Sequence, residues 1–545
     1  MSDTVRLTLD GRAMEVPAGA TVLDAAGRAG VRIPTLCHLR NTEPLNACFV
    51  CIVAVEGDPA MRPACSTVVT DGMVVRSESD DVREARRTAF ELLLSEHYGD
   101  CEGPCTLACP ADLDIPGMID HVTDGDVAAA VATARETIPF NAVLGRICPR
   151  FCERACRRAQ IDEAVAVADL QRYVGDAGTA AGHMPAKAPA TGKTVAVLGA
   201  GPAGLTAAYY LLVAGHACTL FDGRKAPGGR LLDLPEARLP RAVLDAEIDI
   251  VRRLGAGFRM ETRLDPDSGL WEKCRADFDA VLVATGAPLA DANEKLTERS
   301  GRRIDAGLFE GLGLNVTKKG LAADAQTGST SVPGVFAAGE CVSGADWTVR
   351  AVKSARLAAR AVDLFLTGRP VAGETRPINV RMGRLDDAEL AIVRESADAS
   401  ARTATPAPDR EVTEEQAVAE SRRCVRCACL AKDDCRLRDL STEYGARPAQ
   451  FRGGVHRRFA VERSHPDVVY ESNKCILCGL CIREAGEAHE KLGLAFHGRG
   501  FATTVAVPFE RRLAEGLKVA AARCVEACPT GALAWKHGHA PSNER

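Results

Sequence analysis

The most regular pattern of apolar and polar positions lies between Lys193 and Asp222. The apolar run Val195–Leu198 predicts a buried strand, a helical pattern follows it, and a second apolar run ends on the acid Asp222. The turn between strand and helix carries three glycines, Gly199, Gly201 and Gly204. Such glycines let the backbone approach a pyrophosphate, the helix N-terminus attracts the phosphate, and an acid after the second strand accepts from a ribose hydroxyl. The segment predicts a dinucleotide-binding βαβ unit; the alternative is a glycine-rich turn without a ligand.

Other patterns divide the chain into domains. Residues 4–9 and 13–16 have the pattern of a hairpin, and the helix and loop predicted after them suit a small β-grasp ferredoxin. Segments rich in Ala, Pro, Gly or Ser at 178–192 and 396–410 are typical of linkers. We expect a multidomain protein of mixed α/β and α+β class, with domains at residues 1–95, 96–177, 193–371, 411–455 and 456–545.

Composition limits the classes of function. A net charge of −5 offers no basic field for nucleic acid, and the sequence has neither a signal peptide nor an apolar run of about 18 residues. We therefore expect a cytoplasmic protein without a membrane span. The 22 cysteines, mostly in tight groups, indicate metal ligation rather than disulfides, because a reducing compartment keeps thiols free.

The first cysteine group belongs to the predicted ferredoxin domain. One lone cysteine, a close pair and another lone cysteine fit a [2Fe–2S] cluster in a long loop better than zinc, which usually takes two close pairs. The spacing resembles the N-terminal domain of the large electron-input subunit of bacterial complex I and of NAD-linked formate dehydrogenases and hydrogenases. The predicted ligands are Cys37, Cys48, Cys51 and Cys65.

The next two groups resemble the helical domain of the glutamate synthase small subunit and of dihydropyrimidine dehydrogenase. That resemblance implies two [4Fe–4S] clusters that share cysteines crosswise. Carried over by position, the first cluster takes His97, Cys101, Cys105 and Cys156. The second takes Cys109, Cys148, Cys152 and, where dihydropyrimidine dehydrogenase uses a glutamine, Gln171. Two of these residues have simpler alternatives, since His97 could be a capping or surface histidine and Gln171 an ordinary polar residue of a helix.

The segment after Asp222 resembles the flavin-binding region of glutamate synthase-type flavoproteins. The resemblance implies FAD as the dinucleotide, with contacts from a Gly-Gly-Arg loop and from the acid after the last strand. That acid is Glu340 where the family has aspartate, so its contact with the ribityl chain is a weaker expectation. The predicted cofactor residues are Gly199, Gly201, Gly204, Asp222, Gly229, Arg230, Gly339 and Glu340.

The segment between Gly286 and Gly334 is short. Flavoproteins of this kind carry a second complete dinucleotide fold there, which binds NADPH. A nucleotide-binding half-fold needs roughly 100 residues, and this segment has no second GxGxxG motif. We therefore predict that the NADPH domain has been lost and that this chain has no hydride site.

Two cysteine groups follow the flavin region. The first could hold zinc or [4Fe–4S], and its position among clusters favours the latter; it consists of Cys424, Cys427, Cys429 and Cys435. The second resembles a two-cluster bacterial ferredoxin, in which the fourth cysteine of each run ligates the other cluster. Because Ala485 replaces one such cysteine and the second run keeps only two, one [4Fe–4S] cluster is predicted, held by Cys475, Cys478, Cys481 and Cys528.

Together these patterns predict the electron-transfer subunit of a soluble oxidoreductase complex of the formate dehydrogenase or hydrogenase type. Its cofactors would be FAD, one [2Fe–2S] cluster and four [4Fe–4S] clusters. Its partners would be a catalytic dehydrogenase or hydrogenase subunit, and a NAD(P)-binding flavoprotein subunit or a ferredoxin. The alternatives are a self-sufficient FAD-dependent oxidoreductase with its own organic substrate, for which no catalytic acid or base can be named, and a scaffold with structural clusters.

Overall fold

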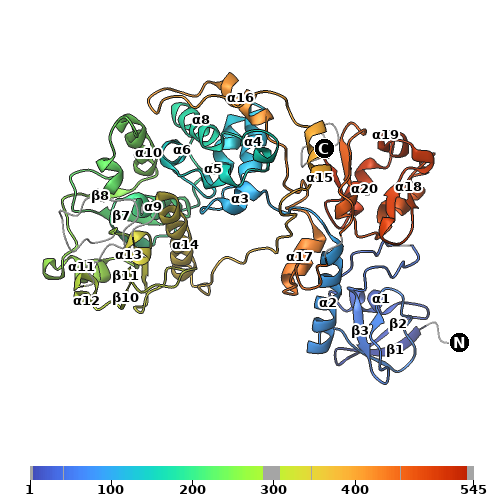
Figure 1. Cartoon of the computed structure of the whole chain (residues 1–545). Coiled ribbons are helices and arrows are strands. Elements are labelled where there is room, and N and C mark those ends of the chain that lie inside the picture. The colour runs from blue at the N-terminus through green and yellow to red at the C-terminus, as the bar shows by residue number, and fades with distance from the viewer. Residues whose placement is uncertain are drawn as a thin grey trace. The chain divides into compact units, whose positions relative to one another are not determined.

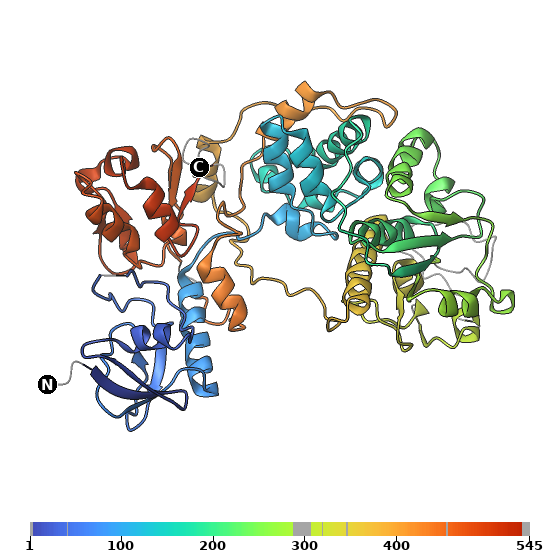
Figure 2. The same ribbon diagram turned by 180° about the vertical axis from the view of Figure 1, so that it is seen from behind.

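A computed structural model describes residues 4–40, 42–286, 307–318, 320–344, 347–453 and 456–536 (Figures 1 and 2). The chain forms two compact units, and the second is inserted into the first. The first unit contains Met1–Glu102, Arg376–Ser396 and Cys427–Arg545, and the second contains Gly103–Thr375 and Ala397–Arg426. This differs from the predicted series of successive domains, because residues 411–455 are divided between the two units.

The first unit begins with a β-grasp sheet. Its strands have the order β2-β1-β5-β3-β4, and β1 pairs in parallel with β5. The predicted hairpin is confirmed, and both turn residues, Asp10 and Gly11, have the positive φ that a tight two-residue turn requires. Helix α1 (Val22–Arg28) starts at a capping box between Thr21 and Asp24. The strands are β1 (Thr4–Leu9), β2 (Arg12–Pro17), β3 (Ile52–Val55), β4 (Arg62–Pro63) and β5 (Met73–Arg76).

Helix α2 (Asp80–Glu96) follows the sheet and packs beside α17 (Arg436–Glu443), which comes from the returning part of the chain (Figure 1). Buried Arg86 joins these parts, because its guanidinium donates to the hydroxyl of Tyr444 at 2.9 Å and to the carbonyl of Ile52 at 3.1 Å. The rings of Phe90 and Tyr444 lie 5.3 Å apart. Segments distant in sequence therefore share one core in this unit.

The remainder of the first unit is a small α+β region. A three-stranded sheet, β13-β14-β17, lies with a hairpin, β15-β16, and helices α18 and α20 pack on each other. The bounds are α15 (Asp387–Glu395), β13 (Val461–Glu462), β14 (Val468–Glu471), α18 (Leu480–Glu487), β15 (Ala495–His497), β16 (Thr504–Ala506), α19 (Leu513–Gly516), α20 (Ala521–Ala527) and β17 (Leu533–Trp535).

The second unit begins with a group of short helices. The closest approach is between α6 and α8, where Gly175 meets α6 and a Cβ would lie 2.1 Å from the amide nitrogen of Ala142. Any larger residue at Gly175 would push the helices apart. The helices are α3 (Pro104–Ala108), α4 (Ile115–Thr123), α5 (Val127–Arg135), α6 (Asn141–Ile147), α7 (Phe151–Arg154), α8 (Val167–Ala180) and α16 (Glu414–Arg422).

The predicted βαβ unit is confirmed as the centre of a five-stranded parallel sheet with the order β12-β9-β6-β7-β8. All four residues of Val195–Leu198 are buried, as the apolar run requires. Helices α9 and α14 pack against each other beside the sheet (Figure 1). The bounds are β6 (Thr194–Leu198), α9 (Pro202–Val213), β7 (Ala217–Phe221), α10 (Arg241–Arg253), β8 (Gly257–Arg259), α11 (Leu270–Asp277), β9 (Ala280–Val283), β12 (Val335–Ala337), α13 (Glu340–Ser343) and α14 (Thr348–Leu366).

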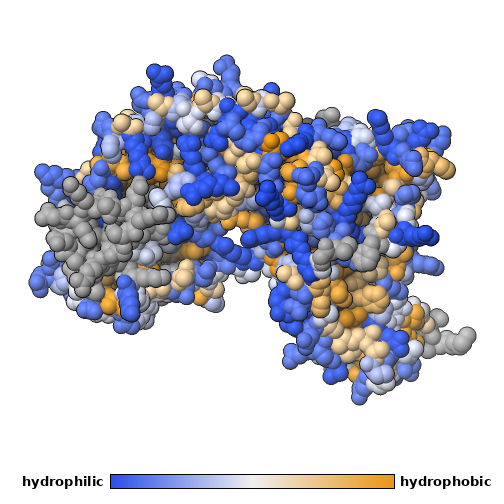
Figure 3. All heavy atoms as spheres, viewed as in Figure 1, coloured by the Kyte–Doolittle hydropathy of each residue, from blue (hydrophilic) through white to orange (hydrophobic). Residues whose placement is uncertain are grey.

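The part of 287–333 that the structure describes contains helix α12 (Gly307–Gly311) and a ribbon of β10 (Val316–Thr317) and β11 (Gly320–Leu321). In that described part there is no second parallel sheet. The visible surface is mainly hydrophilic, with scattered apolar side chains (Figure 3). None of the helices in the described ranges is both long enough and apolar enough to cross a membrane.

Candidate cofactor and metal centres

The four cysteines of the β-grasp region are all buried and lie as two pairs. The sulfur atoms of Cys51 and Cys65 are 3.5 Å apart, and Cys37 is hydrogen-bonded by Cys48. The hydrogen bond from Cys48 lowers the pKa of Cys37 to about 6, and that from Cys65 lowers the pKa of Cys51 to about 7. Thiolates are the form that binds iron. Two pairs suit a [2Fe–2S] cluster, in which each iron takes two cysteines.

A second group in this unit combines residues from both sides of the insertion. The backbone amide of Cys429 donates to the carbonyl of Cys101 at 3.2 Å. Burial, reinforced by the negative charges of Cys429 and Cys101, raises the pKa of Cys435 to about 12. All three cysteines are buried. A Cβ at Gly531 would lie only 2.2 Å from the sulfur of Cys429, so the chain approaches this group too closely for any other residue there.

This grouping differs from the predicted one. The family resemblance implied that Cys101 joins Cys105 and Cys156, and the sequence spacing grouped Cys429 and Cys435 with Cys424 and Cys427. The structure places Cys101, Cys429 and Cys435 in the first unit, whereas Cys105, Cys156 and Cys424 belong to the second. The reason is topological, because the chain leaves the first unit after Glu102, passes through it again at Arg376–Ser396, and rejoins it for the rest of its length at Cys427.

His97 lies in the same part of the first unit, and its ring is buried. The Nδ1 atom is 3.0 Å from the carbonyl oxygen of Lys474, which can only accept, so Nδ1 carries the hydrogen. Burial, with the nearby charge of Lys474, lowers the pKa of His97 to about 4. A neutral imidazole with its hydrogen held by a carbonyl leaves the lone pair of Nε2 for a metal, which is the usual state of a histidine ligand.

In the second unit, one small cavity brings together four predicted ligands. It is lined by Cys109, Cys148, Cys152 and Gln171, along with apolar residues. Burial, with the negative charge of Cys109, raises the pKa of Cys152 well above its ordinary value. The side-chain nitrogen of Gln171 donates to Asn141 at 3.1 Å, which leaves the amide oxygen of Gln171 as the atom for a ligand role. Asn141 was not singled out in the sequence, and nothing in its local pattern marks it.

Three further cysteines of this unit pack against its main core: Cys105, Cys156 and Cys424. Helix α3, which carries Cys105, contacts α7. Arg158 donates to the carbonyl of Arg423 at 3.2 Å and so ties the residue before Cys424 to the turn after Cys156. Cys427, the next cysteine along the chain, is the first residue of the returning part of the first unit.

The C-terminal group also lines one cavity, formed by Cys475, Cys478, Cys481 and Cys528 with surrounding apolar residues. The remnants of the second ferredoxin site are packed away, since Ala485 and Cys524 are fully buried in the core between α18 and α20. The carboxylate of Glu490 accepts hydrogen bonds of 2.6 to 2.8 Å from three successive amides, those of Lys518, Val519 and Ala520. The backbone amides of this loop thus have their hydrogen-bond acceptor within the protein.

Within the described residues, no three His, Cys, Asp or Glu side chains come close enough to share a single metal ion. In the cysteine groups described above, the ligand atoms therefore stand too far apart to share one metal ion. Thiolates around a cluster of several iron and sulfide atoms stand further apart than the four ligands of one zinc ion, so this spacing suits clusters.

The dinucleotide site has the close backbone approaches that its glycines predict. Gly199 has φ +115°, and a Cβ there would lie 2.3 Å from the carbonyl oxygen of Ala284. A Cβ at Gly229 would lie 2.7 Å from the Cα of Gly201, where helix α9 begins. A ligand can therefore meet bare backbone at the helix N-terminus. The cradle fits a dinucleotide.

Acids and an arginine surround this cradle. The carboxylate of Asp222 accepts from the amides of Ala200 at 2.7 Å and Arg224 at 2.8 Å, so it is held beside the glycine turn. Arg230 pairs with Glu340 at 3.1 Å, which brings together two predicted contacts that are far apart in sequence. Gly339, before Glu340, has φ +83° and meets Ala203 of α9.

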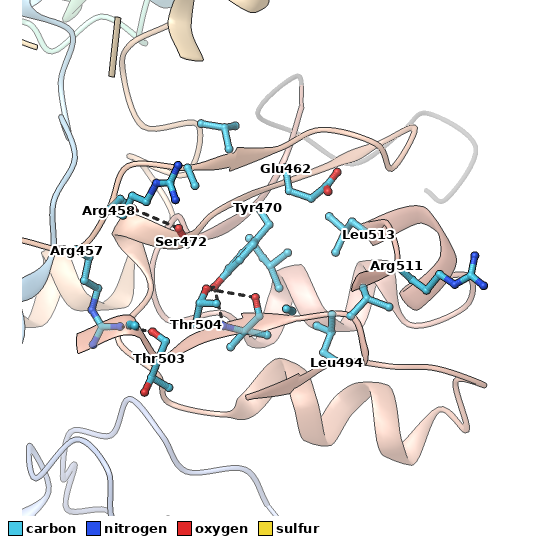
Figure 4. Close-up of a pocket in the computed structure, with 17 residues that line it drawn as sticks. Arg457, Arg458, Glu462, Tyr470, Ser472, Leu494, Thr503, Thr504, Arg511 and Leu513 are labelled. Atoms are coloured by element: carbon cyan, nitrogen blue, oxygen red, sulfur yellow. Dashed lines mark hydrogen bonds between the residues drawn. The ribbon is translucent and has the colours of Figure 1, made fainter. Parts of the chain in front are cut away.

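A larger cavity, of about 570 Å³, lies in the C-terminal region of the first unit (Figure 4). Tyr470 lies at its centre, with its hydroxyl 3.3 Å from that of Thr504 and accepting from the amide of Val505. Arg457 and Arg458 lie on one side and Arg511 on the opposite side (Figure 4). The cavity shares a wall with the Cys475 cavity, formed by Tyr470, Val505 and Leu533.

Four segments of the chain match known domain families. Residues 2–80 match a 2Fe-2S iron–sulfur cluster binding domain, and residues 77–183 match domain II of dihydropyrimidine dehydrogenase, which binds a 4Fe-4S cluster. Residues 197–257 match an NAD(P)-binding Rossmann-like domain, and residues 468–535 match a 4Fe-4S single cluster domain. The matches confirm a 2Fe-2S domain, a helical 4Fe-4S domain, a Rossmann-like domain and a C-terminal 4Fe-4S domain.

Curated relatives cover parts of the chain. The beta subunit of NADP(+)-dependent formate dehydrogenase from Moorella thermoacetica is 37% identical over 207 residues, which is 34% of this chain and 29% of that protein. Subunit HndD of the NADP-reducing hydrogenase of Solidesulfovibrio fructosivorans is 46% identical over 117 residues, 19% of this chain and 20% of that protein. Subunit PreT of NAD-dependent dihydropyrimidine dehydrogenase from Escherichia coli K12 is 36% identical over 191 residues, 34% of this chain and 46% of that protein. The chain spans less than half the length of each.

Among solved structures, the chain aligns with the NAD+-reducing [NiFe]-hydrogenase in the H2-reduced state at 13% identity and a TM-score of 0.33, over 98% of this chain and 88% of that one. The curated relatives above are subunits of oxidoreductases. This chain combines iron–sulfur domains with a Rossmann-like domain.

Proposed function

We propose that this chain is the iron–sulfur and FAD-binding electron-transfer subunit of an oxidoreductase complex. The observation that carries the proposal is the succession of three ligand groups inside the first unit. Cys37, Cys48 and Cys478 belong to one buried cluster, and Arg483 donates to the hydroxyl of Thr42 at 2.7 Å, so the C-terminal group lies beside the ferredoxin group. The sulfur of Cys435 lies 3.8 Å from the carbonyl oxygen of Pro529, the residue after Cys528. Three adjacent groups form a path for electrons, which a single structural site would not need.

The ligand sets follow from these groupings. One [2Fe–2S] cluster is held by Cys37, Cys48, Cys51 and Cys65. A first [4Fe–4S] cluster is held by His97, Cys101, Cys429 and Cys435, and a second by Cys109, Cys148, Cys152 and Gln171. A third [4Fe–4S] cluster is held by Cys475, Cys478, Cys481 and Cys528. A fourth [4Fe–4S] cluster takes three cysteines, Cys105, Cys156 and Cys424. The nearest further cysteine in sequence is Cys427.

The Rossmann-like domain is proposed to bind FAD. FAD supplies one- and two-electron chemistry, which lets a chain of one-electron centres exchange electrons with a two-electron donor. Gly199, Gly201 and Gly229 leave the backbone bare for the pyrophosphate, Asp222 lies where a ribose hydroxyl would bind, and Arg230 is held by Glu340. The short segment between Gly286 and Gly334 leaves no room for a second nucleotide fold, so this chain should carry electrons without its own nicotinamide site.

The proposed partners are a catalytic dehydrogenase or hydrogenase subunit of the formate dehydrogenase or NADP-reducing hydrogenase kind, and a NAD(P)-binding flavoprotein subunit or a ferredoxin. Relatives with these names are 37% identical to this chain over 207 residues and 46% identical over 117 residues. Such partners would place this chain inside the cell.

Coulometric reduction of the anaerobically purified chain tests the proposal. We expect about seven electrons per chain, one for each of five clusters and two for the flavin, with about 18 iron atoms. NADH or NADPH alone should not reduce the flavin, because hydride transfer needs both rings in one site. An uptake near zero at accessible potentials would indicate a scaffold, and rapid flavin reduction by NAD(P)H would show that the chain has its own nicotinamide site.

A further inference from the structure

Lys474 is a buried lysine between two of the proposed ligand sets. Its side chain is 4% exposed. Its backbone carbonyl accepts from Nδ1 of His97 at 3.0 Å and from the hydroxyl of Thr530 at 3.1 Å. The next residue is Cys475. One peptide therefore touches a ligand of each set.

The side chain of Lys474 lies along one of these sets. A Cβ at Gly99, between His97 and Cys101, would lie 3.0 Å from the Cε of Lys474, so the side chain runs along that turn. The Glu471 carboxylate pairs with the ammonium, and this partner keeps the buried ammonium charged. A positive charge thus lies beside the turn that joins His97 to Cys101.

We propose that Lys474 is a positioning residue that orients His97 through its carbonyl and raises, through its ammonium, the reduction potential of the cluster held by His97, Cys101, Cys429 and Cys435. This inference rests on the ligand set proposed above. Reduction adds a negative charge to a cluster, and a nearby positive charge stabilises that state more than the oxidised one. The interaction is strong because the group is shielded from solvent. The backbone contact with His97 needs no side chain, so the charge can be tested separately.

The test is a redox titration of the complete chain followed by EPR. The Lys474→Met variant keeps the length and the carbonyl but removes the charge. We expect full iron content and a more negative potential for the signal that depends on His97. The one-electron equilibrium constant should change about tenfold, which is about 59 mV. The signal that depends on Cys475 should move less, because the side chain runs along the other set.

Three further variants complete the test. Lys474→Arg retains the charge and should restore most of the potential. Glu471→Gln leaves the ammonium without its counter-charge, so the potential should move in the opposite direction, toward positive values. Lys518→Met, at an exposed lysine of the same unit, is the matched control and should change nothing.

Full iron with an unmoved potential in Lys474→Met would overturn the inference. If that variant loses iron, Glu471→Gln decides: a positive shift supports the inference, and an unchanged or negative potential overturns it. The proposed ligand set is judged separately, on the unaltered chain, by whether any cluster signal depends on His97.

Discussion

The Cys475 and His97 sites are both buried in the first unit, but they are built differently. In the Cys475 site, three ligands come from one short loop and the fourth from the start of a turn after α20. In the His97 site, two ligands precede the insertion and two follow it. The first site can form when its own region folds. The second requires the chain to pass through the whole second unit and return, so it links the integrity of the insertion to a metal centre.

The largest effect is expected at the His97 site, whose ligands lie before and after the insertion. Cys429→Ser and His97→Ala should each remove the same EPR signal and about four iron atoms per chain. Cys424→Ser, only a few residues away, should remove a different signal. Iron analysis with EPR of the three variants checks this. If Cys429→Ser and Cys424→Ser abolish the same signal, the two sites are not separate.

The C-terminal site offers a matched pair of cysteines. Cys528→Ser should lose about four iron atoms, because a serine hydroxyl is a poor substitute for a thiolate ligand. Cys524→Ser should keep them, since Cys524 is packed in the core and lies 3.3 Å from the carbonyl of Cys481. Iron content of the two variants is the measurement. Equal losses would mean that Cys524 is also a ligand.

A smaller effect is expected at Gly531, where the backbone lies close to a ligand of the His97 site. Gly531→Ala would place a methyl group 2.2 Å from the sulfur of Cys429. The overpacking should cost about 1–3 kcal/mol of the free energy of unfolding, with the His97-dependent signal broadened or reduced. Denaturant unfolding and EPR measure both. Gly493→Ala, where the nearest neighbour of a Cβ is Ala485 at 3.6 Å, would contribute only the strain of its positive φ and serves as the comparison.

The smallest effect concerns Glu490, whose carboxylate satisfies three amides of the loop before α20. Glu490→Gln retains an oxygen acceptor but loses the charge, so we expect a destabilisation of about 1 kcal/mol with the cluster signal unchanged. Thermal unfolding checks the first point and EPR the second. Loss of the cluster would show that this loop supports the ligands directly.

The sequence by itself determined the features that depend on short spacing. Glycines at positions 199, 201 and 204, the apolar run before them and Asp222 predicted the βαβ unit, because the geometry of one turn is encoded in adjacent residues. The same holds for the ferredoxin loop around Cys37 and for Cys475, Cys478 and Cys481. Replacement of one expected cysteine by Ala485 was enough to predict a single C-terminal cluster.

Only the tertiary structure decided which distant ligands meet. The family resemblance grouped Cys101 with Cys105, four residues away, yet the chain changes units between them and Cys101 contacts Cys429 instead. No local pattern reports such an insertion, because burial and hydrogen bonding of each cysteine depend on the fold and not on its neighbours in sequence. Lys474 was missed for the same reason. It stands directly before a ligand motif, but only packing shows that its side chain is buried and runs along the turn between His97 and Cys101.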